Sequence, residues 1–291
     1  MALDSLPLDI LDTLCQFIPT HDLLSLSLSH SVFYPSAQRY IYRHIALHSE
    51  SDAQRCLSSI NDKRDLARYV RAFALRLDIN ITLQQPFANL LAVALAEMTN
   101  LITLEVVLPP SASSVLAQAV TSDPYYARLA RFSCNFPLQD AVGAFLTRTP
   151  SLKELQLGEA SGDDLSSRAS SQLVISTSAA PELAYFMGSS EDAALLVPNR
   201  PLGAVHLYSG ELTEEVLFAL ARSATPITVF GALTHSLSPS ILLCLASSLP
   251  HLHHLRIMTM YHSSNQPDDV SCSSMMLARR PISNLEIPWH L

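Results

Sequence analysis

A short sequence motif of apolar residues recurs along the chain and limits what this chain can fold into. Written as apolar-x-x-apolar-x-apolar, it occurs nine times between residues 70 and 287, and successive copies begin 22 to 31 residues apart. The copies begin at Val70, Leu101, Leu129, Leu152, Ala180, Leu202, Ile227, Leu252 and Ile282, with those at Ala180 and Ile227 the weakest. Because strand side chains alternate between two faces, each copy predicts a short strand with one buried face.

Stretches with helical spacing separate the predicted strands. They cover residues 87–98, 112–120, 138–147, 214–222 and 240–249. One strand and one helix cannot bury their apolar faces alone, so neighbouring units must stack to form a shared core. The segments 158–172 and 262–274 are rich in small and polar residues and predict surface loops.

Several copies resemble leucine-rich repeats, for example residues 100–106 (Asn-Leu-Ile-Thr-Leu-Glu-Val) and 151–157 (Ser-Leu-Lys-Glu-Leu-Gln-Leu). Repeats of that family are roughly 20–29 residues long, which is close to the spacing here. Regular repeats place Asn at the ninth position, where this chain has Asp, Pro, Ala, Gly, His or Met. The resemblance therefore implies an irregular leucine-rich-repeat solenoid over residues 48–291. A doubly wound α/β domain has the same alternation and is the alternative.

The N-terminal residues 1–47 carry three segments of helical character. Pro7 can begin a helix without losing a needed N–H, and Ile10, Leu11, Leu14, Phe17 and Ile18 follow at helical spacing. The alternating Leu and Ser of residues 24–29 have the period of a strand but follow a capped helix start, so periodicity leaves that segment undecided. Residues 37, 40, 41 and 44 form a third, amphipathic helical pattern.

The apolar residues and prolines of residues 6–47 resemble the F-box in order and spacing. The resemblance is carried by Leu6-Pro7, Ile10-Leu11, Leu14, Ile18-Pro19, Asp22-Leu23-Leu24, Leu26, Leu28, Phe33 and Tyr40-Ile41. It implies a three-helix module, with residues 24–29 helical, that docks on a Skp-family adaptor and joins a cullin–RING ubiquitin ligase. It implies adaptor binding by Leu6, Pro7, Ile10, Leu11, Leu14, Ile18, Pro19, Leu23 and Leu24. Residues 29–33 depart from the Cys/Arg/Trp-type signature of many F-boxes, and three core helices of a helical cap are the alternative.

Together the two resemblances predict an α/β fold class with an N-terminal three-helix F-box over residues 1–47, followed by an irregular leucine-rich-repeat solenoid over residues 48–291. The hydrophobic fraction of 48% indicates a folded chain with much buried surface. The formal net charge of −8 and the lack of a basic stripe argue against a nucleic-acid partner.

The N-terminus, the apolar runs and the cysteines predict a cytoplasmic or nuclear protein with no membrane partner. A secretory signal begins with basic residues, but the first twenty residues contain no Lys or Arg. The longest apolar runs, 90–96 and 241–246, are too short to span a bilayer. The five cysteines are scattered, without C-x-x-C spacing, and are typical of small apolar residues in a reducing compartment.

Catalytic motifs are missing from the sequence, so we expect no enzyme activity and no cofactor. It contains no G-x-S-x-G, phosphate loop, G-x-G-x-x-G or H-E-x-x-H pattern. His251, His253 and His254 form the one histidine cluster, but neighbouring residues of a strand point to opposite faces and cannot bind one metal ion together. We therefore expect no metal site.

The strands also predict a target-binding face. In each copy the residue between the last two apolar positions points away from the core. The resulting candidates are Glu105, Gln156, His206, Arg256 and Glu286, with Glu154 and His254 as the choices in the other register. Both charge signs occur, which favours a protein target. The predicted function is the substrate-recognition subunit of a cullin–RING (SCF-type) ubiquitin ligase. The alternatives are a protein-binding scaffold outside any ligase and a hydrolase.

Overall fold

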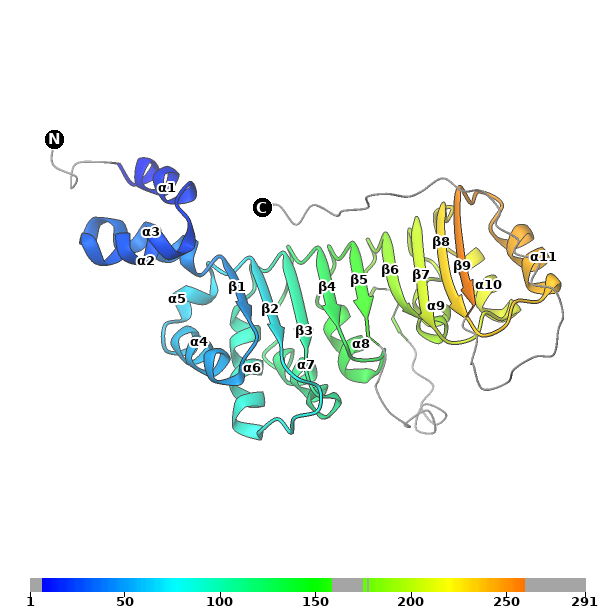
Figure 1. Cartoon of the computed structure of the whole chain (residues 1–291), viewed down its shortest axis with the longest axis horizontal. Coiled ribbons are helices and arrows are strands. Elements are labelled where there is room, and N and C mark those ends of the chain that lie inside the picture. The colour runs from blue at the N-terminus through cyan, green and yellow to red at the C-terminus, as the bar shows by residue number, and fades with distance from the viewer. Residues whose placement is uncertain (1–6, 159–174, 177, 260–291) are drawn as a thin grey trace, which may run out of the picture. The chain divides into compact units, whose positions relative to one another are not determined.

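The computed structural model describes residues 7–158, 175–176 and 178–259, which belong to one compact unit (Figure 1). Its α-helices are α1 (Leu8–Gln16), α2 (Thr20–Ser29), α3 (Tyr34–Ile41), α4 (Glu50–Asp62), α5 (Arg64–Ala67), α6 (Gln85–Glu97), α7 (Ser114–Ala119), α8 (Asp140–Leu146), α9 (Ser190–Leu196), α10 (Glu214–Ala221) and α11 (Pro239–Ser248). Its strands are β1 (His44–Leu47), β2 (Ala72–Arg76), β3 (Thr103–Val107), β4 (Arg131–Cys134), β5 (Glu154–Leu157), β6 (Tyr185–Ser189), β7 (Ala204–Ser209), β8 (Val229–Thr234) and β9 (His254–Thr259). Short 3₁₀ turns, η2 (Ser31–Phe33) and η3 (Pro110–Ala112), precede α3 and α7.

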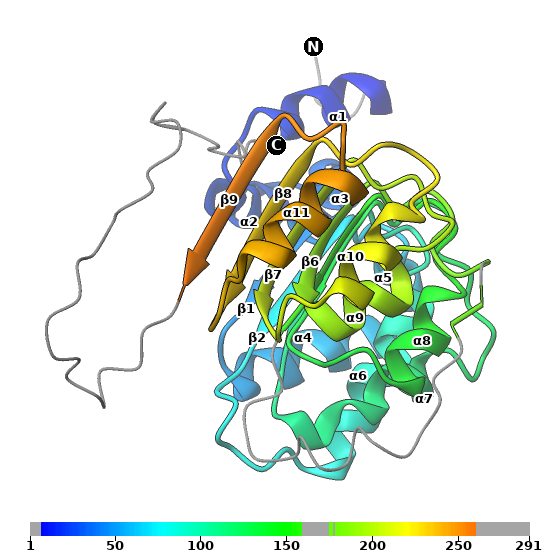
Figure 2. The same ribbon diagram turned by 90° about the vertical axis from the view of Figure 1, so that its right-hand side faces the viewer.

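The nine strands form one sheet in the order β1 to β9, and every strand is parallel to the next. The register shifts between Gly188 and Ser189, where β6 meets β7. Helices α4 to α11 cover one face of this sheet, and no helix of the described residues covers the other, which we call the open face (Figure 2). The strand order does not reverse, as it would in a doubly wound sheet.

The predicted fold class, a three-helix F-box followed by an irregular leucine-rich-repeat solenoid, was wrong. The structure is an α/β fold with a single nine-stranded, all-parallel sheet. Residues 44–47, which we had assigned to the helical module, form its first strand, and the weak copies at Ala180 and Ile227 lead into full strands. The missing Asn side chains predicted irregularity, and the register does shift at Gly188, the ninth position of the copy that begins at Ala180. The neighbouring strand pairs keep one register through their backbone hydrogen bonds.

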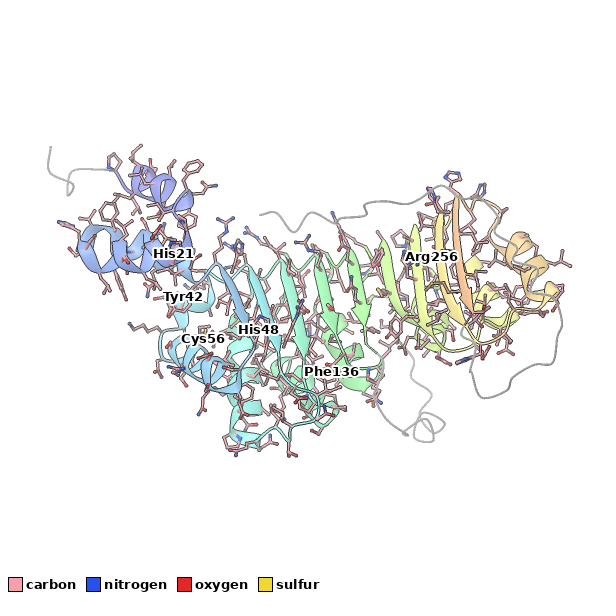
Figure 3. The ribbon with its side chains drawn as sticks, viewed as in Figure 1. His21, Tyr42, His48, Cys56, Phe136 and Arg256 are labelled. Atoms are coloured by element: carbon pink, nitrogen blue, oxygen red, sulfur yellow. The ribbon has the colours of Figure 1, made fainter. Side chains whose placement is uncertain are left out.

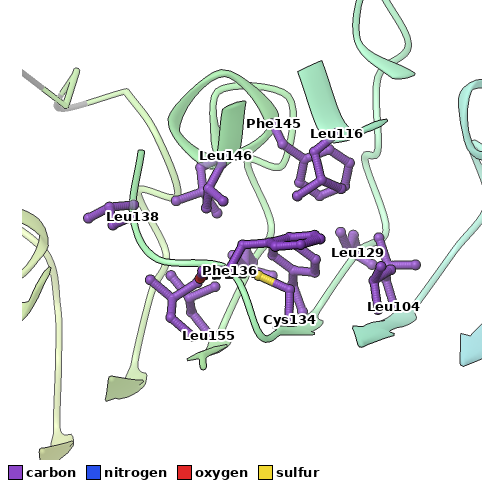
Figure 4. Packing of buried hydrophobic residues seen from close by; sticks show 14 of the residues in the cluster. Leu104, Leu116, Leu129, Cys134, Phe136, Leu138, Phe145, Leu146 and Leu155 are labelled. Atoms are coloured by element: carbon purple, nitrogen blue, oxygen red, sulfur yellow. Dashed lines mark hydrogen bonds between the residues drawn. The ribbon is translucent and has the colours of Figure 1, made fainter. Parts of the chain in front are cut away.

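A row of apolar side chains crosses the whole sheet on its helix-covered face and is buried from β1 to β8. Its members share one register and are Ile45, Phe73, Leu104, Phe132, Leu155, Phe186, Val205, Phe230 and Leu255. In the middle of the sheet the ring of Phe145 from α8 packs 4.8 Å from Phe132 and 5.1 Å from Tyr126 (Figure 4). The Tyr126 hydroxyl donates to the Leu95 carbonyl at 2.9 Å, so its polar end is satisfied within the core.

Four helices begin at a hydroxyl side chain that the sequence supplies. Ser49, Ser189, Thr213 and Ser238 accept a hydrogen bond from the backbone N–H three residues later, at 3.1–3.3 Å. This arrangement satisfies an N–H that the helix itself leaves unpaired. Helices α4 and α9, which begin at two of these caps, were missing from the predicted elements, although Ala53, Leu57 and Ile60 of α4 stand at helical spacing.

We expect Phe145→Ala to lower the free energy of unfolding by about 3–5 kcal/mol, because it leaves a cavity beside two buried rings. The matched control is Phe218→Ala on α10. Phe218 is 57% exposed, so this substitution removes little buried apolar area. Urea unfolding followed by circular dichroism measures both variants. Equal losses in the two variants would contradict this account of the core.

Candidate functional site

Helix α1 carries two apolar stripes, and a small helix needs only one to fold. Leu11 and Cys15 are buried against the neighbouring helices, with Ile18 partly buried beside them. The second stripe is Ile10, Leu14 and Phe17, at i, i+4 and i+7, with exposed fractions of 48%, 45% and 79%. This outward stripe, which we call the α1 stripe, is covered by nothing in the described part of the chain.

Helix α2 shows the same division. Leu23 is buried in the small core of the three helices, whereas Leu24 and Leu28, one turn apart, are exposed. Helix α3 lies between the other two and binds α1 through an ion pair between Arg39 and Asp12 at 2.7 Å. The Arg39 guanidinium also lies 5.9 Å from the ring of Tyr69, which links the three helices to the segment before β2.

The structure separates the predicted adaptor-binding residues into two groups. Pro7, Ile10, Leu14, Pro19 and Leu24 are exposed, and Ile18 is partly buried. Leu11 and Leu23 form the core of the three helices and are therefore not available to a partner. Leu6 lies outside the described residues. The sequence reasoning missed Phe17 and Leu28 as surface residues, because periodicity shows that α1 is apolar but not which stripe faces inward.

The open face of the sheet brings four of the five predicted target-binding residues into one row. Its members, here called the middle row, are Ala46, Ala74, Glu105, Ser133, Gln156, Met187, His206, Gly231 and Arg256. Glu154 and His254 also lie on this face, in the row before. Figure 3 shows Arg256 near the β9 end of the sheet. Glu286 lies outside the described residues.

Two polar contacts stabilise neighbouring strands on this face. Arg76 donates Nε and Nη2 to the two carboxylate oxygens of Glu105, at 2.6 and 2.9 Å. This bidentate pair raises the pKa of Arg76 through the hydrogen bonds and the charge of Glu105. Arg131 donates Nε and Nη2 to the Thr103 hydroxyl, at 3.2 and 3.1 Å. These contacts fix the positions of four polar side chains on a face that also carries Ala, Gly and Met.

His206 lies flat near the β9 end of the middle row. Its ring packs 5.5 Å from Tyr185, and a Cβ at Gly231 would meet its Nδ1 at 2.5 Å, so a larger residue at position 231 would require the His206 ring to move. Burial lowers the pKa of His206 from its ordinary value of 6.5, and the charge of Arg256 lowers it further. We therefore expect a neutral imidazole at pH 7.

Groups typical of catalytic centres do not converge in the described residues. No set of three or more His, Cys, Asp or Glu side chains within these residues could hold a metal ion. Burial raises the pKa of the Cys56 thiol and raises that of Cys134 to about 12, so neither is an activated nucleophile. No helix of the described ranges is both long and apolar enough to cross a bilayer.

Comparisons with known proteins add no relative: no family model and no curated protein matches this chain.

We expect Arg256→Gln to raise the pKa of His206 toward 6.5 without restoring it fully, because burial is the larger cause of the shift. Histidine NMR signals followed over pH measure this change, with Arg222→Gln as the control. The folded pKa lies below the unfolded one, so the free energy of unfolding falls as the pH drops from 6.5 through the folded value. An unchanged pKa in Arg256→Gln would contradict the placement of Arg256 beside His206.

Proposed function

We propose that this chain is a non-catalytic substrate receptor of a cullin–RING ubiquitin ligase. In this proposal the α1 stripe and the exposed side of α2 bind a Skp-family adaptor, and the open face of the sheet binds a target protein. The observation that carries the proposal is the second apolar stripe of α1, formed by Ile10, Leu14 and Phe17.

An exposed stripe of large apolar side chains is costly in water and marks a contact site when it is rimmed by polar groups. The residues beside it, Asp9, Thr13 and Gln16, are polar and exposed. A helix that presents such a stripe can lie in an apolar groove of a partner. The resemblance of residues 6–47 to the F-box supports the choice of a Skp-family adaptor as that partner.

The open face supports a protein as the second ligand. It is a regular array of partly exposed side chains with both charge signs, including Glu105, His206 and Arg256. Mixed charges of this kind can select a partner by electrostatic complementarity. A role in the cytoplasm or nucleus, without nucleic acid, membrane or cofactor, belongs to the same proposal. A binding scaffold outside any ligase is the alternative, and it requires target binding without adaptor binding.

We expect Leu14→Ser combined with Phe17→Ser to weaken binding of a purified Skp-family adaptor by at least about tenfold, because central apolar contacts are worth about 2 kcal/mol or more each. Both side chains are exposed, so the thermal midpoint should change little. Isothermal titration measures affinity, and circular dichroism measures folding.

The matched control is Phe218→Ser combined with Leu243→Ser, which removes two exposed apolar side chains from α10 and α11. Adaptor affinity should be unchanged in this variant. Adaptor binding that survives the α1 variant would refute the proposed docking surface. Leu23→Ala is expected to act differently, by unfolding the three helices, since Leu23 belongs to their core.

A further inference from the structure

Arginines gather at the edge of the sheet where β1 to β4 begin. Arg43 and Arg71 directly precede β1 and β2, and the Arg71 N–H donates to the Arg43 carbonyl at 2.9 Å, so their strands are adjacent. Arg131 begins β4, and Arg128 is exposed in the loop just before it. Nitrogen-bearing side chains line this edge in Figure 3. We call these four residues the arginine edge.

The arginine edge differs from Arg76, at the other end of β2, because its members have no carboxylate partner among the described residues. Arg76 has Glu105 as a bidentate partner, but none of the ion pairs among the described residues includes a member of the arginine edge. Glu154 lies in register with Arg131, yet Arg131 donates to the Thr103 hydroxyl.

The remaining contacts of the arginine edge leave donors free for a ligand. Arg43 lies 5.8 Å from the ring of Tyr40, and Arg71 donates one hydrogen bond, from Nη1 to the Asn100 carbonyl at 3.1 Å. The arginines also repel one another: burial first, and then the charges of Arg128 and Arg43, lower the pKa of Arg71. This local excess of positive charge stands out in a chain of formal net charge −8.

We propose that the arginine edge is a docking surface for an acidic, carboxylate-bearing segment of a target protein. This inference rests on the proposed function, because it names the chemistry of the target that the proposed receptor binds.

The geometry of strands and guanidinium groups fits such a segment. Neighbouring strands are about 4.8 Å apart, and side chains on one side of an extended peptide recur about every 7 Å. An acidic segment that crosses β1 to β4 can therefore place successive carboxylates within reach of different arginines. Each guanidinium can bind a carboxylate through two parallel hydrogen bonds, as Arg76 binds Glu105.

The test is fluorescence anisotropy of the full chain with a labelled peptide of repeating Glu-Ser pairs, compared with a peptide of repeating Gln-Ser pairs. We expect the Glu-Ser peptide to bind, and Arg43→Gln combined with Arg128→Gln to weaken it at least about tenfold, because charge-assisted hydrogen bonds are lost. Both replaced side chains are exposed, so this variant should fold normally. Arg71→Lys keeps the charge but loses the planar fork and should bind with intermediate affinity.

The control is Lys63→Gln combined with Arg222→Gln, which changes the net charge equally at two exposed positions away from the edge. It should retain affinity within about twofold, since distant surface charges are screened by salt. Equal loss in both double variants, equal binding of the Gln-Ser peptide, or no binding of either peptide would overturn the inference. Preference for a phosphoserine peptide or a single-stranded oligonucleotide over the Glu-Ser peptide would also overturn it.

This experiment is independent of the ligase assignment. The Arg43 and Arg128 variant should bind a Skp-family adaptor as the unmodified chain does. Peptide binding in a chain that fails to bind any adaptor would refute the receptor proposal and support the arginine edge.

Discussion

The in-register stacking of apolar side chains from strand to strand is the interaction on which the rest of the structure depends. No strand of this sheet exceeds six residues, and none can bury its apolar face alone. Each is held by backbone hydrogen bonds to its neighbours, and its apolar residues are covered by the helices and by the rows on either side. Phe230 in β8, with a strand on each side, is 1% exposed, whereas its register partner Leu255 in β9 is 49% exposed. Ile45 in β1, the other edge strand, is only 8% exposed because α3 and α4 pack against that strand, so cover by helices decides whether an edge strand is buried.

The same stacking fixes the spacing of side chains on the open face. Because one register runs through all nine strands, side chains far apart in sequence reach the open face at regular spacing. Neighbouring strands and their side chains approach each other closely at two glycines. Gly158 allows the backbone of Asn135 to approach, and Gly231 allows the ring of His206 to lie flat. Asn135 in turn exchanges two hydrogen bonds with the backbone of Leu108, at 3.0 and 2.7 Å, and so joins neighbouring turns.

The three N-terminal helices follow a different principle. Their core is small, with Cys15, Leu23 and Ala37 fully buried, and much apolar surface is left over. That surplus distinguishes them from α6, where most apolar residues are buried against the sheet. A rigid sheet with a polar open face, next to helices with an unpaired apolar stripe, offers two chemically distinct contact surfaces.

The sequence by itself determined the alternation of strand and helix and the two faces of each strand, since both follow from local periodicity. It therefore placed Glu105, Gln156, His206 and Arg256 on one face before their neighbours were known. Local pattern could not decide whether the Leu and Ser of residues 24–29 are helical, and the structure makes them helical through packing against α3. It could not tell which stripe of α1 faces inward, because both stripes are apolar.

Only the tertiary structure decided that consecutive strands form one sheet, that β1 belongs to it, and that Arg43, Arg71 and Arg128 meet at one edge. These features depend on contacts between distant residues, since paired strand residues such as Tyr185 and Ala204 or Ala72 and Thr103 are 19 to 31 positions apart, and no local period encodes them.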